Sequence, residues 1–306
     1  MPLVECIPNF SEGRRAEVIE SVVKSIADVE GVYVLDRSSD PDHNRTVVTF
    51  AGAPEVVTEA AFQGIKTAAA LIDLDLHNGV HPRIGAADVV PFVPLRDVTL
   101  RECVMLAQAL GQRVANELNI PVYLYEKAAL RPERANLAVV RRDAYEKLKT
   151  TIQTDPDRAP DYGLPVLGRA GAVAIGARAP LIAFNAYLDT SDVEIAKKIA
   201  RTVRELGGGL PYLKALGLLV GGRAQVSMNV IDYRKTSLFA IMEALRAAAA
   251  QQDAAITHTE LVGLIPQAAL MDTALSYLQL PMTTHDLTLE KQLGLRTGDY
   301  REIDFE

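Results

Sequence analysis

Apolar residues along the chain follow two spacings, one typical of strands and one typical of helices. In the first half, short runs of β-branched and apolar residues predict strands at 3–7, 32–36, 45–52, 86–94 and 120–125. Apolar positions that recur every three or four residues predict helices at about 14–27, 54–71 and 100–118. Ser11 stands where the N-cap of the first of these helices is expected.

The second half of the chain shows the same alternation of predicted strands and helices. Strands are predicted at 181–187, 214–220, 224–231 and from residue 256, and helices at 191–206, 236–250 and about 266–278. Gly221 and Gly222 lie between two predicted strands, which indicates a hairpin. Ser191 with Glu194 three residues later has the spacing of a capping box.

The order strand-helix-strand-strand-helix-strand is the split βαβ pattern of ferredoxin-like domains. Because it occurs twice, we expect an α+β protein of two tandem ferredoxin-like subdomains, with a ligand cleft between them. The polar stretch Arg131–Asp161 is the best candidate for a boundary, and the glycine-rich stretch that follows it, up to Arg178, can act as a connector. We expect the subdomains to span residues 1–178 and 179–306.

Composition and charge narrow the class of protein. The net charge of −7 argues against nucleic acid as a partner, because phosphate binding requires clustered Lys and Arg. No apolar run reaches membrane-spanning length, and the start of the chain lacks the order of a signal peptide. The 306 residues include only two cysteines, Cys6 and Cys103, which fits a reducing compartment without disulfides. We therefore expect a cytoplasmic protein.

The stretch HNGVHPRIGA, which begins at His77, holds two histidines four residues apart. On a helix this spacing could bind a metal ion, but Gly79 and Pro82 argue against a helix here, so we expect no metal. An ordinary solvated turn and a catalytic loop remain as alternatives. For catalysis, His81 is restricted by Pro82 and is followed within two residues by Arg83, which could hold an anion. Position alone does not decide between them.

The other candidates for chemistry are weaker. Asp161–Arg178 contains four glycines and two arginines, so its backbone could approach a flat ligand, or it could simply connect the two halves. Cys6 lies on a predicted strand and Cys103 on the apolar face of a predicted helix, which favours core positions over nucleophiles. No Gly-x-Ser-x-Gly motif of a serine hydrolase is present.

Several longer stretches together resemble the formiminotransferase domain family, found in glutamate formimidoyltransferases and at the start of formimidoyltransferase-cyclodeaminases. They are spread over nearly the whole chain: VECIPNFSEG (Val4–Gly13), NRTVVTFAG (Asn44–Gly52), HPRIGAADVVPFVP (His81–Pro94), PVYLYEKAA (Pro121–Ala129), LIAFN (Leu181–Asn185) and AQVSMN (Ala224–Asn229). Such a set is far more specific than a single loop.

The resemblance implies a function. The family transfers a formimino group from N-formimino-L-glutamate to tetrahydrofolate, the co-substrate, giving 5-formimidoyltetrahydrofolate and L-glutamate in histidine degradation. It also implies two subdomains with folate between them, and a homodimer. The family's catalytic histidine corresponds to His81. Its folate-binding loop corresponds to Gly163, Leu164, Pro165, Val166, Leu167, Gly168, Arg169, Ala170 and Gly171.

The reaction requires groups that the chain offers. Attack of the folate N5 on a protonated amidine gives a tetrahedral centre, which collapses when N5 loses a proton and the glutamate nitrogen gains one. A single histidine can make both transfers. Asp40 or Asp42 could stabilise the amidinium, and Arg45 or Arg83 could pair with carboxylates. Asn44 and Arg178 complete the expected substrate-binding set. Two alternatives stay open: an N-formylglutamate donor, and a folate-binding protein without catalysis.

Overall fold

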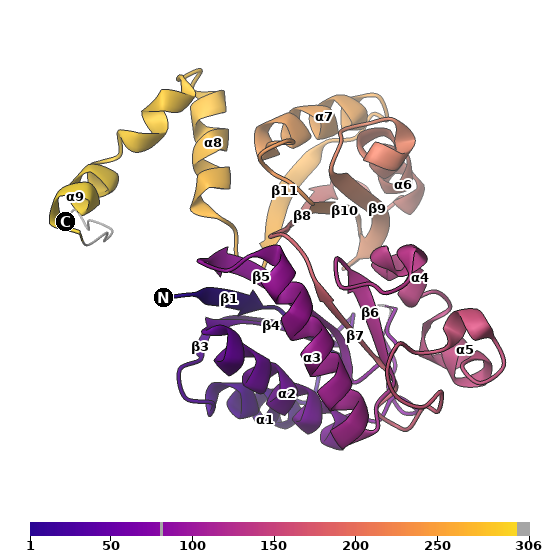
Figure 1. Ribbon diagram of the computed structural model, residues 1–306. Coiled ribbons are helices and arrows are strands. Elements are labelled where there is room, and N and C mark those ends of the chain that lie inside the picture. The colour runs from indigo at the N-terminus through magenta and orange to yellow at the C-terminus, as the bar shows by residue number, and fades with distance from the viewer. Residues whose placement is uncertain (80–81, 299–306) are drawn as a thin grey trace. The chain divides into compact units, whose positions relative to one another are not determined.

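The computed structural model describes residues 1–79 and 82–298 (Figure 1). The chain forms two compact units, Met1–Pro180 and Leu181–Glu306. Each unit has its own sheet and its own hydrophobic core. The expected α+β organisation with two subdomains is confirmed.

The first unit is built on a seven-stranded sheet. Its strands are β1 (Leu3–Cys6), β2 (Asn9–Phe10), β3 (Tyr33–Asp40), β4 (Arg45–Gly52), β5 (Ala87–Arg96), β6 (Val122–Glu126) and β7 (Val173–Ala177). Strand β1 pairs with both β4 and β5, and β3 pairs with β4, all antiparallel, which gives the ferredoxin-like order β5-β1-β4-β3. Strand β2 follows β1 and pairs with the same two neighbours. Beyond β5, β7 and then β6 extend the sheet in parallel.

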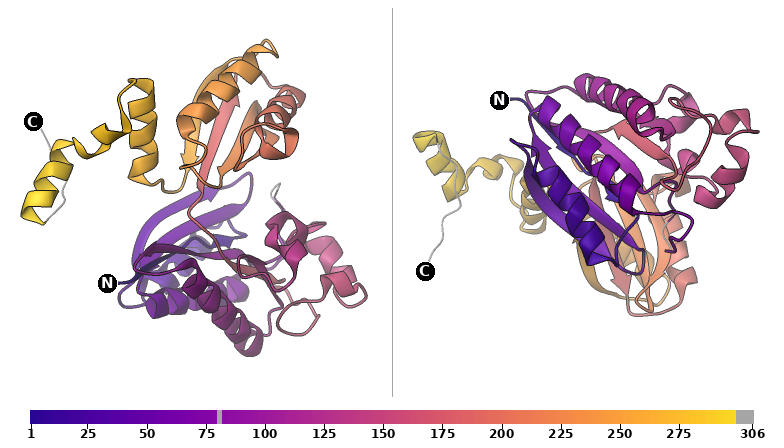
Figure 2. Two further views of the ribbon diagram at one scale, coloured as in Figure 1. Left: turned by 45° about the horizontal axis from the view of Figure 1, so that its top comes forward. Right: turned by 90° about the horizontal axis from the view of Figure 1, so that it is seen from below.

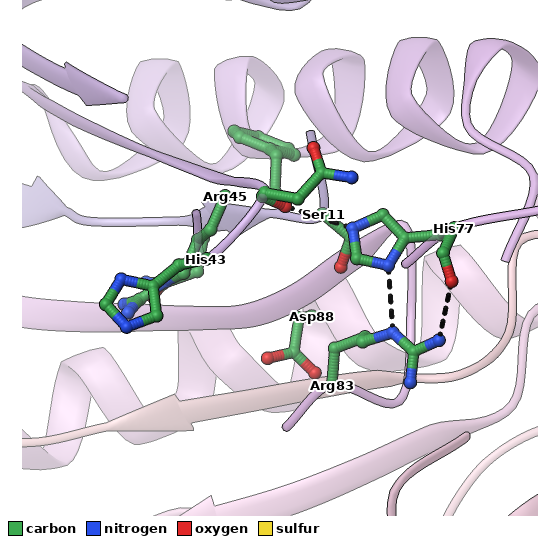
Figure 3. A pocket seen from close by; sticks show the side chains of 9 residues that line it. Ser11, His43, Arg45, His77, Arg83 and Asp88 are labelled. Atoms are coloured by element: carbon green, nitrogen blue, oxygen red, sulfur yellow. Dashed lines mark hydrogen bonds between the residues drawn. The ribbon is translucent and has the colours of Figure 1, made fainter. Parts of the chain in front are cut away.

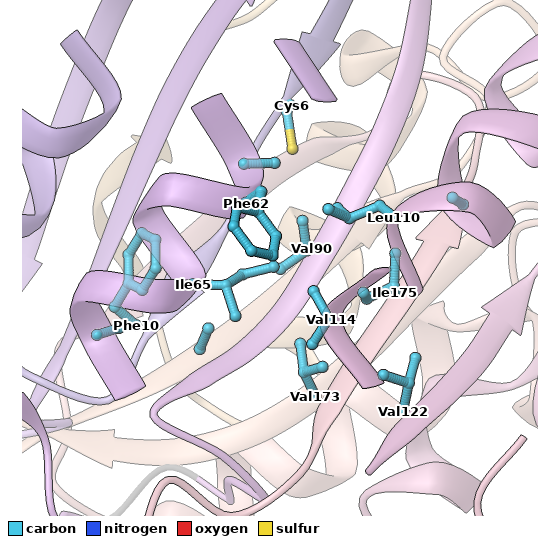
Figure 4. Packing of buried hydrophobic residues seen from close by; sticks show 14 of the residues in the cluster. Cys6, Phe10, Phe62, Ile65, Val90, Leu110, Val114, Val122, Val173 and Ile175 are labelled. Carbon is cyan, nitrogen blue, oxygen red and sulfur yellow. The ribbon is translucent and has the colours of Figure 1, made fainter. Parts of the chain in front are cut away.

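Three amphipathic helices, α1 (Ala16–Ala27), α2 (Pro54–Leu71) and α3 (Leu100–Leu118), cover one face of this sheet (Figure 2). The core between helices and sheet contains Phe62 and Ile65 of α2, Leu110 of α3, and Val90 and Ile175 of the sheet (Figure 4). Burying each such side chain contributes roughly 1.5–3 kcal/mol. The helix layer and the sheet therefore share one continuous hydrophobic core.

The opposite face of the sheet, called the open face below, is covered only in part. The short elements η1 (Pro132–Ala135), α4 (Leu137–Val140), α5 (Ala144–Thr151) and η2 (Pro156–Arg158) follow β6 in the chain. Tyr123 and Val89 of the sheet share a small second core with Val140 and Leu148 from these elements.

The polar stretch after Arg131 does not separate the two units, because β7 follows it and pairs between β5 and β6. Two buried arginines hold the stretch together. Arg134 lies 2.7 Å from the carboxylate of Asp161, and Arg158 donates to the carbonyls of Val139, Val140 and Arg142. Buried charges of this kind require such partners, and a reading of local polarity cannot reveal them.

The second unit has a four-stranded antiparallel sheet in the order β11-β8-β10-β9, again ferredoxin-like. Its elements, with those that follow them, are β8 (Ile182–Leu188), α6 (Val193–Val203), η3 (Glu205–Gly207), β9 (Leu213–Val220), β10 (Arg223–Val230), α7 (Leu238–Ala250), β11 (Ile256–Val262), α8 (Gln267–Tyr277), η4 (Met282–Asp286) and α9 (Leu289–Thr297). The predicted hairpin at Gly221 and Gly222 is confirmed, and both glycines have positive φ. Within residues 1–79 and 82–298, no helix is both long and apolar enough to cross a membrane.

Two predicted helix caps are wrong. Helix α6 is capped by Asp192, whose side chain accepts from the backbone N–H of Glu194, and not by Ser191. Helix α1 begins only at Ala16, and the buried Ser11 instead donates from its Oγ to the carbonyl of Gly85 at 2.7 Å. At α6 the chain offers two adjacent residues of capping type, Ser191 and Asp192, whereas the N-cap of α1 is Arg15, well after Ser11.

Candidate functional site

A small pocket lies where the turn between β3 and β4, the strand β2, and the loop before β5 meet (Figure 3). It holds about 200 Å³, part of it open to solvent. Its lining residues are Asn9, Phe10, Ser11, His43, Asn44, Arg45, His77, Arg83 and Asp88. Three of them, Asn44, Arg45 and Arg83, belong to the predicted substrate-binding set, and His77 belongs to the loop predicted to be catalytic.

Asn44 joins three segments at this pocket. Its φ is +49°, a left-handed conformation that asparagine tolerates better than most residues. Its Oδ1 accepts from the N–H of Gly13 at 2.8 Å, and its Nδ2 donates to the carbonyl of Asn78 at 3.0 Å. The buried side chain therefore holds the loop around Asn78 against the turn between β3 and β4.

Asp40 and His43 form a pair in the same turn. Oδ1 of Asp40 accepts from the backbone N–H groups of Asp42 and His43 at 2.8 and 2.9 Å, and Oδ2 lies 2.6 Å from Nδ1 of His43. Burial raises the pKa of Asp40, but the hydrogen bonds from the backbone and ring of His43 outweigh it, so the pKa is lowered. Asp42 is exposed and does not line the pocket. His43 was missed from the sequence, although the Asp-x-x-His spacing of an Asx-turn could have indicated it.

His77 is fixed in one protonation state. Its Nδ1 lies 2.9 Å from Nε of Arg83, which can only donate, so Nδ1 must accept and Nε2 must donate to the carbonyl of Asn44 at 3.0 Å. Burial, and further the charge of Arg83, lower the pKa of His77 although the bond to Asn44 opposes this. Both nitrogens of this neutral ring are engaged, as the dashed contacts in Figure 3 show for Arg83. His77 is therefore a structural group of the loop.

Arg83 is bound within the protein. Its guanidinium makes two hydrogen bonds to the carboxylate of Glu146, at 2.9 and 2.7 Å, and a third to the carbonyl of His77 at 3.0 Å. The hydrogen bonds from Arg83 are the largest cause of the lowered pKa of Glu146. Such a bidentate pair orients both side chains. Arg83 thus connects the histidine loop to α5.

Asp88 reaches the open face through an irregularity in the sheet. Asn9 pairs with Val89 and Phe10 pairs with Ala87, so the register between β2 and β5 skips Asp88, as in a β-bulge. The buried carboxylate accepts from the N–H of Ile84 at 2.8 Å and also binds Arg141. In a regular strand, successive side chains alternate between faces, and the bulge interrupts this alternation at the pocket.

Arg45 has a different environment from the other charged groups. Its Nη2 donates to the side-chain oxygen of Asn9, a neutral group, and its buried Nε has no hydrogen-bond partner. Burial, followed by the charge of Arg141, lowers the pKa of Arg45 to about 10. Within the described part of the chain, no carboxylate lies within ion-pair distance of Arg45. Arg141, which the sequence did not indicate, also has a buried Nε without a partner.

The segment predicted to bind folate, Gly163–Gly171, runs beside the loop that precedes β5. Gly171 pairs with Gly85, and Ala86 donates to the carbonyl of Ala170 at 2.8 Å. A Cβ at Gly85 would lie only 1.7 Å from the carbonyl oxygen of Ala172, so the close approach requires glycine there. Two segments that the sequence singled out separately are therefore neighbours.

Arg178 does not lie at the pocket. It follows β7, where its N–H donates to the carbonyl of Phe92 at 3.1 Å and its side chain to the carbonyl of Ala179. His81 lies outside the described residues, but Gly79, two residues before it, packs against the turn: a Cβ there would lie 2.4 Å from the carbonyl oxygen of His43.

A search of residues 1–79 and 82–298 finds no group of three or more His, Cys, Asp or Glu side chains arranged to hold a metal ion. Both cysteines are free and buried. Burial raises the pKa of the Cys103 thiol to about 11 and also raises that of Cys6, so neither is a ready thiolate. The polar chemistry of the first unit therefore rests on arginine, histidine, asparagine and aspartate.

Comparison with known families decides what this site belongs to. The formiminotransferase domain, N-terminal subdomain, matches residues 3–178, and the formiminotransferase domain matches residues 183–295. The chain belongs to the formiminotransferase family. It is 47% identical to glutamate formimidoyltransferase of Thermoplasma acidophilum, over 96% of this chain and 98% of that protein. The corresponding enzyme of Streptococcus pyogenes is 45% identical, over 95% and 97%.

Bifunctional relatives match as well. Formimidoyltransferase-cyclodeaminase of Mus musculus is 43% identical over 90% of this chain, which spans 52% of that longer protein. The resemblance inferred from the sequence is confirmed, and so is the enzyme class, a transferase.

Proposed function

We propose that the chain transfers the formimino group of N-formimino-L-glutamate to tetrahydrofolate, giving 5-formimidoyltetrahydrofolate and L-glutamate, as a step of histidine degradation. The names of its full-length relatives support this reaction. The structural observation that carries it is the anchoring of the histidine loop. Asn44, His77 and Arg83 fix that loop beside the pocket through hydrogen bonds on both sides of residues 80–81.

In this proposal His81 is the proton-transfer group. The folate N5 attacks the amidinium carbon, and the resulting tetrahedral carbon is bonded to three nitrogens: N5, the glutamate nitrogen and the formimino nitrogen. His81 takes the proton from N5 and returns it to the glutamate nitrogen, after which the bond to that nitrogen breaks and L-glutamate leaves. Such transfers by one imidazole contribute about 100-fold or more. No covalent intermediate with the enzyme is needed, which agrees with two buried cysteines.

Other residues bind and orient the substrates. The carboxylate of Asp40, kept ionised by its lowered pKa, can stabilise the positive charge of the amidinium. Asp40, Asp42 and Arg178 stay weaker candidates than Arg45, because none of the three lines the pocket. Arg45 or Arg83 can bind substrate carboxylates, although Arg83 is already bound to Glu146. The enclosed room in the pocket, about 10 Å³, is the size of a single small group, so the pocket can take only the end of a ligand.

The rest of the folate would lie along Gly163–Gly171. The contact between Gly171 and Gly85 supports this assignment, because it brings that segment beside the histidine loop. Leu164 and Val166 are exposed there and offer apolar surface to a ring. We also propose a cytoplasmic homodimer with small-molecule substrates, without nucleic acid or membrane partners and without a bound metal. The net charge of −7 supports the exclusion of nucleic acid.

A turnover assay with two donors tests the function. The purified chain is mixed with tetrahydrofolate and either N-formimino-L-glutamate or N-formyl-L-glutamate, and release of L-glutamate is followed. We expect release from the formimino donor. Faster release from the formyl donor would establish the alternative donor instead. Binding of tetrahydrofolate by calorimetry, without release from either donor, would identify a folate-binding protein and reject the proposed reaction.

A further inference from the structure

We propose that Arg45, supported by the charge of Arg141, is a carboxylate-binding subsite on the open face of the first unit. The proposal deepens the proposed function, and it rests on that function only for the identity of the ligand. The chemistry of the ligand, a carboxylate, follows from the charges and hydrogen bonds of the described residues.

One cation at the pocket, Arg45, has no carboxylate bound to it. Arg83 is paired with Glu146, and Arg141 is paired with Asp88. Arg45 has only the neutral Asn9 as a hydrogen-bond partner in the described chain, so its positive charge has no bound counter-charge. A cation removed from water without such a counter-charge destabilises a protein. An anionic ligand would supply what is missing.

Asp88 and Asp40 are near enough to oppose the fall in the pKa of Arg45, but neither is hydrogen-bonded to it. The carboxylate of Asp40 accepts from Asp42 and His43 instead. One carboxylate oxygen of Asp88 accepts from the N–H of Ile84, and the other binds Arg141. The bulge that holds Asp88 thus commits its carboxylate to groups other than Arg45. The geometry leaves the guanidinium of Arg45 available at the pocket wall.

Unused donors point to the same ligand. The Nε atoms of Arg45 and Arg141 are both buried and have no hydrogen-bond partner. A buried donor without an acceptor costs free energy, and a guanidinium offers parallel N–H groups that match the two oxygens of a carboxylate. With its pKa at about 10, Arg45 remains protonated at neutral pH. The group is therefore cationic and incompletely hydrogen-bonded under working conditions.

Two carboxylates of the proposed reaction could bind here: one of the amino-acid donor, or one of the glutamate tail of folate. Both have the same chemistry, and the small volume of the pocket favours the smaller donor. The experiment must therefore separate the two sources.

The test compares Arg45→Met and Arg45→Lys with Arg142→Met, a matched control whose arginine is 57% exposed and outside the pocket. We expect Arg45→Met to raise the KM for the formimino donor by about 10- to 100-fold, the loss expected for a hydrogen bond to a charged group. The KM for tetrahydrofolate should change less than threefold, and the melting temperature should not fall. Arg45→Lys should lie between, because it keeps the charge but loses the planar fork.

Other outcomes are equally decisive. A rise in the KM for tetrahydrofolate alone would keep the carboxylate subsite and assign it to the folate tail. A lower melting temperature with both KM values unchanged would show that Arg45 is a structural cation, which overturns the proposal.

Calorimetry separates this proposal from the proposed function. L-glutamate and p-aminobenzoyl-L-glutamate, probes for the two carboxylate sources, are titrated into the wild type, Arg45→Met and Arg142→Met. Binding of either probe to the wild type and to Arg142→Met, weakened at least tenfold in Arg45→Met, supports the subsite even if no transfer is detected. Equal affinity in all three proteins, or no binding of either probe to the wild type, contradicts it.

Discussion

The two units share one strand order, but their corresponding loops differ. In the second unit, the hairpin between β9 and β10 turns through Gly221 and Gly222, which contribute no side chain. In the first unit, the corresponding turn between β3 and β4 contributes His43 and Asn44 to the pocket. The same topological position therefore serves as a simple turn in one unit and as a wall of the candidate site in the other.

The connections before the last ferredoxin-like strand differ in the same way. Residues 251–255 join α7 to β11 in the second unit, whereas residues 72–86 join α2 to β5 in the first. The longer connection contains His77 and the His81 segment. Long loops on a rigid scaffold commonly carry function. In the first unit, the longer connection also lines the pocket.

The two units also differ in how many charged side chains they bury. Among the described residues, Glu12, Arg83, Asp88, Arg134 and Arg158 are buried charged residues of the first unit, whereas the second unit buries only Asn185, Gln225 and Thr236 among its polar residues. Buried charges stabilise less than apolar packing unless they are fully paired. Of this set, Arg83 and Asp88 line the pocket, whereas Arg134 and Arg158 hold together the stretch that follows β6.

The largest expected effect comes from breaking the buried pair at the bulge. Asp88→Asn leaves Arg141 without its counter-charge, so we expect a loss of about 3–5 kcal/mol in the free energy of unfolding. The matched change in the second unit, Glu194→Gln, removes an exposed pair with Lys197 at 2.8 Å and should cost under about 1 kcal/mol. Urea denaturation measures both. Equal losses would remove the distinction between the units.

A second comparison uses glycines. Gly85→Ala places a Cβ 1.7 Å from a backbone oxygen, which should cost roughly 3 kcal/mol and reduce turnover by displacing the histidine loop. Gly221→Ala in the second unit meets no atom within 4 Å, so only its positive φ of +55° opposes it, at about 1 kcal/mol. Melting curves and turnover are measured on both variants. If Gly221→Ala proved as harmful to turnover as Gly85→Ala, the site would not be confined to the first unit.

The smallest effect concerns pH. The pKa of His77 is lowered in the folded state from 6.5, so the unfolded chain binds a proton at His77 before the folded chain does. The contribution of His77 is therefore fully present above pH 6.5 and is lost as pH falls through the folded pKa. The carboxyl group of Asp40, whose pKa is lowered, contributes to the pH dependence of stability only below its usual pKa of 3.8. Melting temperature between pH 7 and 5 should fall less in His77→Gln than in the wild type. Parallel curves would show that His77 is not held neutral.

The order of strands and helices could be predicted from the sequence, because periodicity reports which face of each element is buried. Strand β7 could not, because Val173–Ala177 is short and is preceded by glycines that also suit a connector. Its pairing with β5 and β6 joins residues that are far apart in the chain, and local patterns do not report such pairing. The extension of the first sheet therefore appears only in the structure.

The residues of the site also differ in whether the sequence could indicate them. Asn44, Arg45 and the histidine loop stand out in the sequence because turn residues and adjacent charges are local signals. Arg141 gave no signal, because its partner Asp88 is 53 residues away in the chain. Asp88 reaches the open face through a bulge, which a simple alternation of side chains does not predict. What sequence patterns miss here is long-range pairing of charges.

The account depends most on one histidine, and steady-state turnover of His81→Ala tests it most directly. His77→Ala serves as the matched control, since His77 belongs to the same loop. We predict that His81→Ala keeps the melting temperature and both KM values near those of the wild type and loses roughly 100-fold or more in kcat, while His77→Ala loses much less. Near-normal kcat in His81→Ala would contradict the proposed proton transfer, and equal losses in both variants would indicate that the two histidines act as a pair.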